Sequence, residues 1–485
     1  MKFFKLEFFL LILIVLLGFY LRLYKIDNPI ADWHSWRQAD TAAVARNFFK
    51  EGFNPFLPKY DDMSGVAEKP YPNPNRFRFV EFPIYPSLIY LGYLINGGVD
   101  EKIARFVSIL FSLGSIVFLY LITKRYLDKF SAYLAAILFA ITPFVVFFSR
   151  AILPESSLLF FCLGMVYFTD RWIYEDKRNL LLLSIFFTSA AFLTKPMAIF
   201  YLIPLFFLIY KKEGKLNFNP TRYLVWIIPS LLPLLAWRLW ISQHPEGIPA
   251  SNWLLNGADS SGKTIRFRPA FWRWIISDRL SREILSPIGL GVFLLGILTK
   301  SSLRNTFLYI LATFSFLYLI IFARGNVQHD YYQYLITPAL IIFSAKGFGL
   351  LFKGAPFLIP RLISIPIGLS LFFLMIYLSW VEVKGLYQIN NPVIVETGKF
   401  ADKILPKEAI VVAPYNGDSA FLYQVNRPGW PNLSFPIEDL IKNYGVTHYI
   451  STTRDENTVK IMQKYKVLED NPKFVIVDVR YEDLK

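Results

Sequence analysis

Residues Phe8 to Tyr20 read FFLLILIVLLGFY, and residues Asp32 to Phe48 read DWHSWRQADTAAVARNF. The first stretch is apolar and, with its neighbours, long enough to cross a bilayer. The second follows soon after it and carries acid, base, imidazole, indole and amide side chains. A chain that leaves a membrane and then presents such a group is predicted to use it at the bilayer surface.

The composition extends the apolar pattern to most of the chain. The 485 residues are 54% hydrophobic and 18% charged, and Phe (47) and Tyr (28) are abundant. Apolar blocks of about 15–20 residues recur, which is the length that spans a bilayer core. Because soluble helices would be amphipathic rather than uniformly apolar, the sequence predicts a polytopic α-helical membrane protein with about eleven spans.

The basic residues and the single cysteine limit other interpretations. The net charge of +15 would suit nucleic acid, but Lys and Arg fall mostly between apolar blocks, where membrane topology explains them. No nucleic-acid partner is therefore expected. Cys162 alone excludes an intrachain disulfide and a cysteine-based metal cage. The N-terminus has a basic start without a small-residue cleavage site, so it is interpreted as a retained first span.

The order of the spans predicts which turns share a side of the membrane. Lys2 and Lys5 place the N-terminus in the cytoplasm, and the Lys/Arg clusters after every second span fall on that same side. The turns at 32–81, 150–155, 195 and 324–333 then lie outside a plasma membrane that the chain crosses many times. The proline-broken piece 82–95 is predicted to be interfacial or re-entrant. The predicted spans are 6–24, 103–123, 130–148, 158–174, 180–193, 197–210, 224–241, 287–298, 306–323, 334–343 and 362–380.

The tail differs in character from the rest. Residues 1–384 are predicted to form a membrane module with a first outer loop at 25–102, and residues 385–485 a small extracytoplasmic α/β domain. No catalytic motif is apparent in the tail. Its predicted strands are 409–414, 447–451 and 474–479, and its predicted helices are 437–444 and a segment from the cap Asp455 to about 465.

The first outer loop holds the strongest candidates for chemistry. Outside the membrane, a carboxylate such as Asp32 or Asp40 can act as general base toward an acceptor hydroxyl. His34 and Arg37 lie between them as candidate substrate ligands. If the segment is helical, Arg37 and Asp40 share a face. The alternative is a solvated juxtamembrane helix anchored by its tryptophans.

Two further acids lie at outer turns. Glu81, in FRFVEFPIYP, is a candidate ligand or hydrogen-bond acceptor, with pairing to Arg76 or Arg78 as the alternative. Arg150 and Glu155 flank the turn between the third and fourth spans. They are candidates for substrate binding, and a capped helical hairpin is the other interpretation.

Two outer turns carry cations that suit a lipid phosphate. Lys195, in LTKPMAIF, can bind phosphate as a point charge, and snorkelling is the alternative. Arg324 precedes the run HDYYQ at 329–333, whose tyrosines could also be interfacial belt residues. A divalent metal held by His329 and Glu81 stays an open possibility, although no ligand spacing fixes it. The candidate binding residues of this run are His329, Tyr331, Tyr332 and Gln333.

One motif is rejected. Residues 257–264, GADSSGKT, match the nucleotide-binding loop pattern G-x-x-x-x-G-K-[ST]. That pattern works only between a strand and a helix of an α/β sheet, and the outer segment is too short for one. No nucleotide is expected there. The arginines and aromatic residues from 266 to 279, Arg279 included, favour an interfacial element that contacts lipid headgroups.

Together these motifs resemble the GT-C superfamily of polyprenyl-phosphate-sugar glycosyltransferases. The motifs are DWHSWRQAD, VEFP, RAILPE, LTKP and HDYYQYLITP, and the likeness covers roughly residues 8–343. The most similar groups are the protein O-mannosyltransferase-like enzymes, of glycosyltransferase family 39 type, and the bacterial aminoarabinose transferases that modify lipid A.

The resemblance implies an inverting transfer of one sugar from a polyprenyl-phosphate donor to a hydroxyl of a protein, lipid or glycan on the outer face. Asp40 or Asp32 would deprotonate the acceptor, although the adjacent Asp-Glu pair of the relatives is absent here. Cations would stabilise the leaving phosphate. The residues that the resemblance assigns to the donor are Glu81, Lys195, Arg324, His329 and Tyr332.

A transporter or flippase of polyprenyl-linked sugars is the alternative. It predicts inverted repeats and charges near the middle of the membrane. The polar residues of this chain gather instead at one predicted surface, which favours an enzyme.

Overall fold

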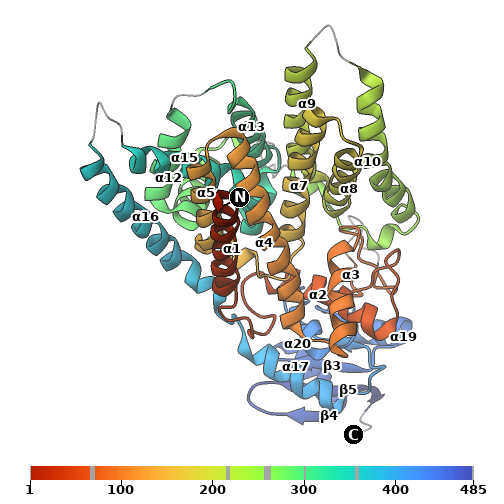
Figure 1. Cartoon of the computed structure of the whole chain (residues 1–485). Coiled ribbons are helices and arrows are strands. Elements are labelled where there is room, and N and C mark those ends of the chain that lie inside the picture. Colours follow the sequence, from red (N-terminus) through yellow and green to blue (C-terminus); the bar gives the residue numbers. More distant parts are fainter. Residues whose placement is uncertain are drawn as a thin grey trace. The chain divides into compact units, whose positions relative to one another are not determined.

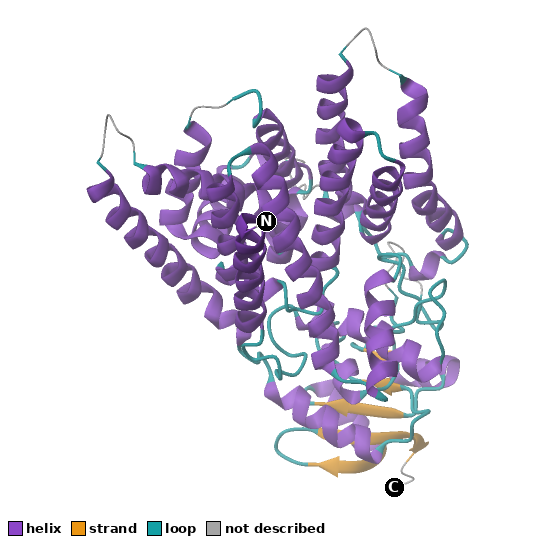
Figure 2. Ribbon diagram, in the orientation of Figure 1, coloured by secondary structure: helices purple, strands orange, loops and turns teal. Residues whose placement is uncertain are grey.

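The computed structural model describes residues 2–65, 72–214, 219–255, 264–299, 302–354 and 360–482 (Figures 1 and 2). The chain divides into two compact units. Unit 1 comprises Met1–Ile26, Phe106–Trp237 and Ser251–Leu386, and unit 2 comprises Asp27–Arg105, Arg238–Ala250 and Tyr387–Lys485.

Unit 1 is helical. Apolar runs of this length form helices because a helix satisfies its own backbone hydrogen bonds without water. Its principal helices, two of which extend into unit 2, are α1 (Lys2–Arg22), α4 (Glu101–Tyr126), α5 (Lys129–Ile141), α6 (Pro143–Phe148), α7 (Glu155–Glu175), α8 (Arg178–Thr194), α9 (Ile199–Glu213), α10 (Pro220–Ile241), α11 (Pro269–Arg273), η5 (Trp274–Leu285), α12 (Ser286–Leu298), α13 (Thr306–Ile321), α14 (Ala323–Gln328), η6 (Asp330–Ile336), α15 (Thr337–Lys353) and α16 (Arg361–Val383).

Each predicted apolar block lies in one or more of these helices. By length and composition, five helical stretches among the described residues are able to cross a membrane. The number of eleven spans stays a prediction. The five stretches are Glu101–Tyr126, Pro220–Ile241, Pro269–Leu298, Asp330–Lys353 and Arg361–Ile404.

A break divides the predicted span 130–148 into α5 and α6. Pro143 has no backbone N–H, so the carbonyl of Phe139, four residues earlier, loses its helical partner. The fully buried Arg22 supplies donors at this break: its Nη2 donates to Phe139 O at 3.3 Å and its Nη1 to Ala140 O at 2.9 Å. A buried guanidinium is tolerated here because it satisfies carbonyls that the proline leaves open.

All strands of the described residues belong to unit 2, where they are orange in Figure 2. They form one sheet of order β2-β1-β3-β5-β4, parallel between β2, β1 and β3 and antiparallel between β3, β5 and β4. The strands are β1 (Val411–Val412), β2 (Gly429–Trp430), β3 (His448–Ser451), β4 (Tyr465–Asp470) and β5 (Val475–Glu482). The accompanying helices are α2 (Ser35–Glu51), α3 (Ile84–Asn96), α17 (Pro392–Ile404), α18 (Ala420–Val425), α19 (Ile437–Tyr444) and α20 (Glu456–Lys464).

The predicted elements of the tail are present; β1 and β3 are shorter than predicted, whereas β5 continues to Glu482. The helix at 437–444 has the predicted bounds, and Asp455 caps α20 by accepting from Thr458 N at 2.8 Å. Strand β4 was not predicted, because YKVLED alternates with charged residues at a solvent-exposed edge of the sheet. The helices α17 and α18 were not predicted either.

The first loop and the tail share a core within unit 2. Met63 is buried among Val412, Trp430 and Val477 of the tail. Its backbone N donates to Gly429 O at 2.8 Å, and Gly429 N donates to Asp61 O at 2.9 Å, so residues 61–63 extend the sheet beside β2. The close strand approach requires glycine at 429, since a Cβ there would lie 1.8 Å from Val411 O.

Candidate active site

Helix α2 of unit 2 is polar and yet buried along most of its length. The alanines at its centre favour a helix, and the chain leaves the helix at Gly52, where φ is +103°. His34 precedes the helix in a left-handed conformation, with φ of +56°, which is uncommon for a residue other than glycine. A polar helix enclosed by protein needs a partner for each of its charges.

Arg37 binds the first of these partners. Its Nη2 forms an ion pair with Glu81, and its Nη1 donates to Thr41 Oγ1 at 3.3 Å. The pairing of Glu81 with Arg76 or Arg78 that the sequence left open is therefore wrong. Arg76 instead binds both oxygens of Glu51, at 2.7 and 2.6 Å.

Asp40 lies between two donors from other segments. Arg78 Nη2 donates to its Oδ2 at 2.5 Å, and Ser419 Oγ donates to its Oδ1 at 2.5 Å. The residue is only 4% exposed. Arg37 and Asp40 do not pair with each other, because each contacts a group outside α2. Each oxygen of the buried Asp40 carboxyl therefore has a hydrogen-bond donor.

Two further carboxyls influence this neighbourhood. Burial raises the pKa of Asp62 to about 6, a hydrogen bond from Ser64 opposes the shift, and the charge of Asp40 adds to it. Burial likewise raises the pKa of Asp418 to about 6, again with a contribution from Asp40. Neither residue was a candidate from the sequence.

Asp32 has a different environment. Gln38 Nε2 donates to Asp32 Oδ1 at 2.7 Å and to the carbonyl of Trp33 at 2.9 Å. Asp32 is 1% exposed. Gln38 is a neutral amide donor, whereas Asp40 accepts from the guanidinium of Arg78.

The second half of α2 is fixed to the tail. Arg46 forms an ion pair with Asp61, donates to Tyr423 O at 2.8 Å and places its guanidinium 4.0 Å from the Tyr423 ring centroid. Asn47 Nδ2 donates to Asp61 Oδ1 at 3.1 Å. These contacts were missed in the sequence, where Arg46 carries no motif and Tyr423 lies far along the chain.

Within unit 1, Glu155 and Lys195 form a buried ion pair. Glu155 opens α7 and is 3% exposed, and Lys195 ends α8 and is 7% exposed. The Lys195 ammonium lies 5.8 Å from the Tyr331 ring centroid and 5.1 Å from that of Tyr332. Four predicted residues, Glu155, Lys195, Tyr331 and Tyr332, are thus brought together. Because Lys195 is buried, it does not snorkel to solvent.

Arg150 is also buried, and its guanidinium lies 5.5 Å from the ring centroid of Phe147. Helix α7 begins at Glu155, after the N-cap Pro154, three residues before the predicted span 158–174. Arg324 is exposed on α14.

His329 lies among aromatic rings. Its ring centroid is 5.3 Å from that of Tyr331, 5.7 Å from that of Tyr332 and 5.5 Å from that of Trp253. Trp253 was not a candidate, because nothing in its local sequence links it to residue 329. Gln333 donates to Asn326 O at 2.8 Å and to Asn326 Oδ1 at 2.9 Å, which ties η6 to α14.

Arg279 corrects one expectation. It was predicted to contact lipid headgroups, but it binds protein groups: Glu283 Oε2 at 2.7 Å, Val327 O at 3.1 Å and Asp330 Oδ2 at 3.5 Å. These contacts connect η5 to the turn before η6.

The sequence left open a divalent metal held by Glu81 and His329. Glu81 is engaged by Arg37, and His329 packs against three aromatic rings. The described residues contain no group of three His, Cys, Asp or Glu side chains able to hold a metal ion. Glu81 belongs to unit 2 and His329 to unit 1, so a divalent metal held by this pair stays a prediction. The rejected nucleotide motif at 257–264 lies outside the described residues except for Thr264.

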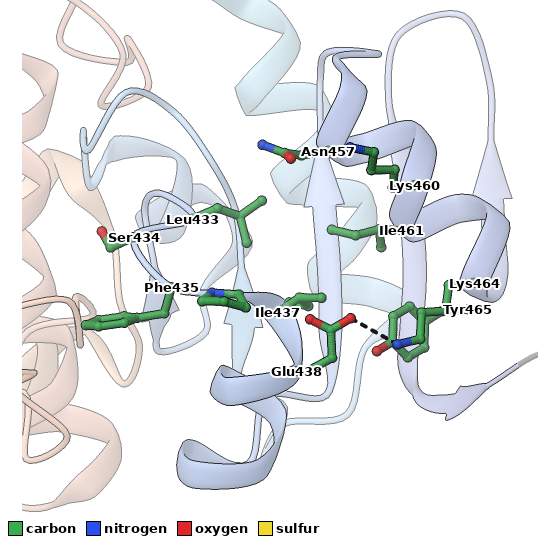
Figure 3. A pocket seen from close by; sticks show the side chains of 11 residues that line it. Leu433, Ser434, Phe435, Ile437, Glu438, Asn457, Lys460, Ile461, Lys464 and Tyr465 are labelled. Atoms are coloured by element: carbon green, nitrogen blue, oxygen red, sulfur yellow. Dashed lines mark hydrogen bonds and ion pairs between the residues drawn. The ribbon is translucent and has the colours of Figure 1, made fainter.

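Unit 2 also contains a pocket of about 400 Å³ between α19 and α20 (Figure 3). None of the predicted site residues lines it. Its charged side chains pair on the protein itself, Lys464 with Glu438 at 3.0 Å and Lys460 with Glu456 at 2.5 Å. The pocket is therefore separate from the Asp40 site.

Comparison with solved structures shows which fold the chain shares. The chain matches ArnT from Cupriavidus metallidurans bound to undecaprenyl phosphate with a TM-score of 0.66 and 13% identity, over 96% of this chain and 97% of that one. It matches the Archaeoglobus fulgidus oligosaccharyltransferase AglB, in complex with an inhibitory peptide and a dolichol-phosphate, with a TM-score of 0.56 and 11% identity, over 99% and 75%. The mycobacterial arabinofuranosyltransferase AftD gives a TM-score of 0.56 at 13% identity, over 98% and 42%. The chain therefore has the fold of these three structures, which agrees with the resemblance found in the motifs.

Comparison with protein sequences gives a family model and two relatives that match parts of the chain. The family model described as dolichyl-phosphate-mannose-protein mannosyltransferase matches residues 80–240. The putative mannosyltransferase YkcB of Bacillus subtilis (strain 168) is 24% identical over 245 residues, which cover 50% of this chain and 31% of that protein. An uncharacterized protein of Aquifex aeolicus (strain VF5) is 34% identical over 124 residues, 25% of this chain and 29% of that protein. The chain thus spans less than a third of the length of these curated relatives.

Proposed function

We propose that the protein is an inverting glycosyltransferase that moves one sugar from a polyprenyl-phosphate donor to an acceptor hydroxyl on the outer face of a membrane. The observation that carries the proposal is the match over 96% of the chain to a structure bound to undecaprenyl phosphate. The dolichyl-phosphate-mannose family model supports the same donor class. A protein, a lipid and a glycan remain candidate acceptors.

Asp40 is the proposed general base. The acceptor hydroxyl transfers its proton to the Asp40 carboxylate, the acceptor oxygen forms a bond to the anomeric carbon, and the bond from that carbon to the phosphate oxygen breaks. One displacement inverts the configuration. Arg78 and Ser419 donate to the two oxygens of this carboxylate and so fix its orientation.

The leaving phosphate gains negative charge as the sugar departs, so cations should bind it. Lys195 and Arg150 are the proposed ligands within unit 1, and Arg324 on α14 is a further candidate. The rings of Tyr331 and Tyr332 lie beside this lysine, and His329 stacks on Tyr331, so these rings are suited to a sugar face. No step is assigned to a metal ion.

The arrangement in the membrane belongs to the same proposal. The N-terminus would be cytoplasmic, and the tail after residue 384 would be extracytoplasmic. The alternation of Lys/Arg clusters along the sequence supports this orientation.

The test is Asp40→Asn in the full-length protein reconstituted with a polyprenyl-phosphate-linked sugar. Loss of a general base is expected to reduce transfer about 10²–10⁴-fold. Asp27→Asn is the matched control, because Asp27 lies in the same unit with a side chain 72% exposed. Equal transfer by wild type and Asp40→Asn would contradict the assignment. Mass analysis of polyprenyl-linked sugars that accumulate in a deletion strain would identify the donor.

A further inference from the structure

We propose that the turn at Asp418–Ser419 in the C-terminal segment sets the ionisation and orientation of Asp40, with Ser419 as a positioning residue for the reaction. This inference rests on the proposed function, in which Asp40 is the base. It gives the tail, which carries no catalytic motif of its own, a direct part in the site.

The contact is short and enclosed. Ser419 Oγ lies 2.5 Å from Asp40 Oδ1, and the carbonyl of Trp36 lies 3.2 Å from the same hydroxyl. Ser419 is 7% exposed and Asp40 4%. Because a hydroxyl has one hydrogen, the nearer and charged acceptor receives it. The carboxylate is then fixed from one side by Ser419 and from the other by Arg78.

The turn that presents Ser419 is itself held firmly. Gly417 has a φ of +78°, and its N–H donates to Pro431 O at 3.1 Å, just after β2. Asp418 Oδ1 accepts from Ala420 N at 2.7 Å, which fixes the start of α18. The backbone of this turn is therefore held by hydrogen bonds next to the sheet, and this fixes the position of the Ser419 hydroxyl.

Helix α18 is also fixed to α2 at a second point. Arg46 of α2 donates to the Tyr423 carbonyl at 2.8 Å and stacks on its ring. Gln424 Nε2 donates to Ile30 O at 3.0 Å, ahead of α2. Two anchor points along α18 prevent the Ser419 hydroxyl from moving away from Asp40.

The charges around Asp40 give the two turn residues opposite effects. Ser419 donates a hydrogen bond to the Asp40 carboxylate, while the carboxylates of Asp418 and Asp40 repel each other when both are ionised. Burial places the pKa of Asp418 itself near 6, so Asp418 is charged at neutral pH. The other groups that influence Asp40 are Arg78, Asp62 and the phenol of Tyr60.

The test is the pH profile of sugar transfer by the full-length protein. The acid limb is the part of the profile in which transfer falls as the pH is lowered. In Ser419→Ala this limb should move to higher pH by about one unit, because a hydrogen bond to the carboxylate is lost. In Asp418→Asn the acid limb should move to lower pH, because a neighbouring negative charge is removed. The amide oxygen of Asn still accepts the hydrogen bond at the start of α18. Ser419→Thr retains the hydroxyl and should restore the wild-type limb. Ser434→Ala, at an exposed serine of the same unit, is the control.

The outcomes separate the inference from the function it rests on. Unchanged transfer by Asp40→Asn would remove the base assignment. An inactive Asp40→Asn together with an unshifted limb in Ser419→Ala would overturn the inference alone. A lowered melting temperature in Ser419→Ala without any change of the limb would show a purely structural contact and would also overturn it.

Discussion

Variants of the buried ion pair between Glu155 and Lys195 can separate an effect on stability from an effect on sugar transfer. Lys195→Met removes the cation and leaves Glu155 charged and enclosed, with a side chain only 3% exposed. Glu155 Oε2 accepts no hydrogen bond from any described residue, so little else there stabilises the anion. Removing one partner of a buried pair costs about 3–5 kcal/mol. We therefore expect a large loss of stability in the single variant.

The double variant Lys195→Met/Glu155→Gln is the informative one. A neutral amide at 155 carries no uncompensated charge, so most of the lost stability should return. Transfer should not return, because the proposed phosphate ligand is still absent. Glu155→Gln alone keeps the lysine and should keep most of the transfer.

The assays are thermal unfolding of the detergent-solubilised protein and sugar transfer after reconstitution. Arg171→Met is the matched control, since it breaks a surface pair with Glu175 on the same helix α7, and should cost less than about 1 kcal/mol. Transfer that recovers together with stability in the double variant would refute the phosphate role of Lys195. A Lys195→Met variant as stable as wild type would refute the energetic argument.

Two other variants test unit 2. Asp62 has a folded-state pKa of about 6, above its ordinary 3.8, so the stability it contributes is full below about pH 3.8 and lost as pH rises through 6. Asp62→Asn keeps the acceptor for Ser64 N, so its free energy of unfolding relative to wild type should rise by up to about 3 kcal/mol between pH 4 and pH 8. The measurement is unfolding at each pH. A difference between the two proteins that does not change with pH would contradict this. Gly429→Ala should unfold unit 2 or lower its melting temperature strongly, because the new Cβ meets Val411 O. The control Gly385→Ala, with open space around it, should behave as wild type. Equal melting temperatures of the two variants would refute the close approach at 429.

The helices were predictable because a uniformly apolar run has few other ways to satisfy its backbone in a membrane. The residues at which the helices end were less predictable. The predicted span 334–343 stopped before Lys346, yet α15 continues to Lys353. Lys346 is accommodated because its ammonium donates to Tyr309 Oη at 2.7 Å and to Thr299 O at 3.2 Å. Such partners come from other helices, and periodicity does not reveal them.

The candidate residues were recognisable, but their pairings were not. The spacing of Arg37 and Asp40 indicated a common helical face, whereas the partners, Glu81 and Arg78, come from the loop after the helix. Ser419 lies at a helix start that a local pattern could have indicated. No local signal could show that it contacts Asp40, since the two are 379 residues apart.

The extension of the sheet by residues 61–63 has a consequence for biosynthesis. This segment leaves the ribosome long before Gly429, the residue to which its backbone binds. At ordinary translation rates the interval lasts tens of seconds. During that time the nascent loop has neither its strand neighbour nor the carbonyl and hydroxyl that later meet Arg46 and Asp40. Maturation of this site must therefore wait until residues 419–429 have been made, and a ribosome that stalls before them releases a chain with an unfinished site.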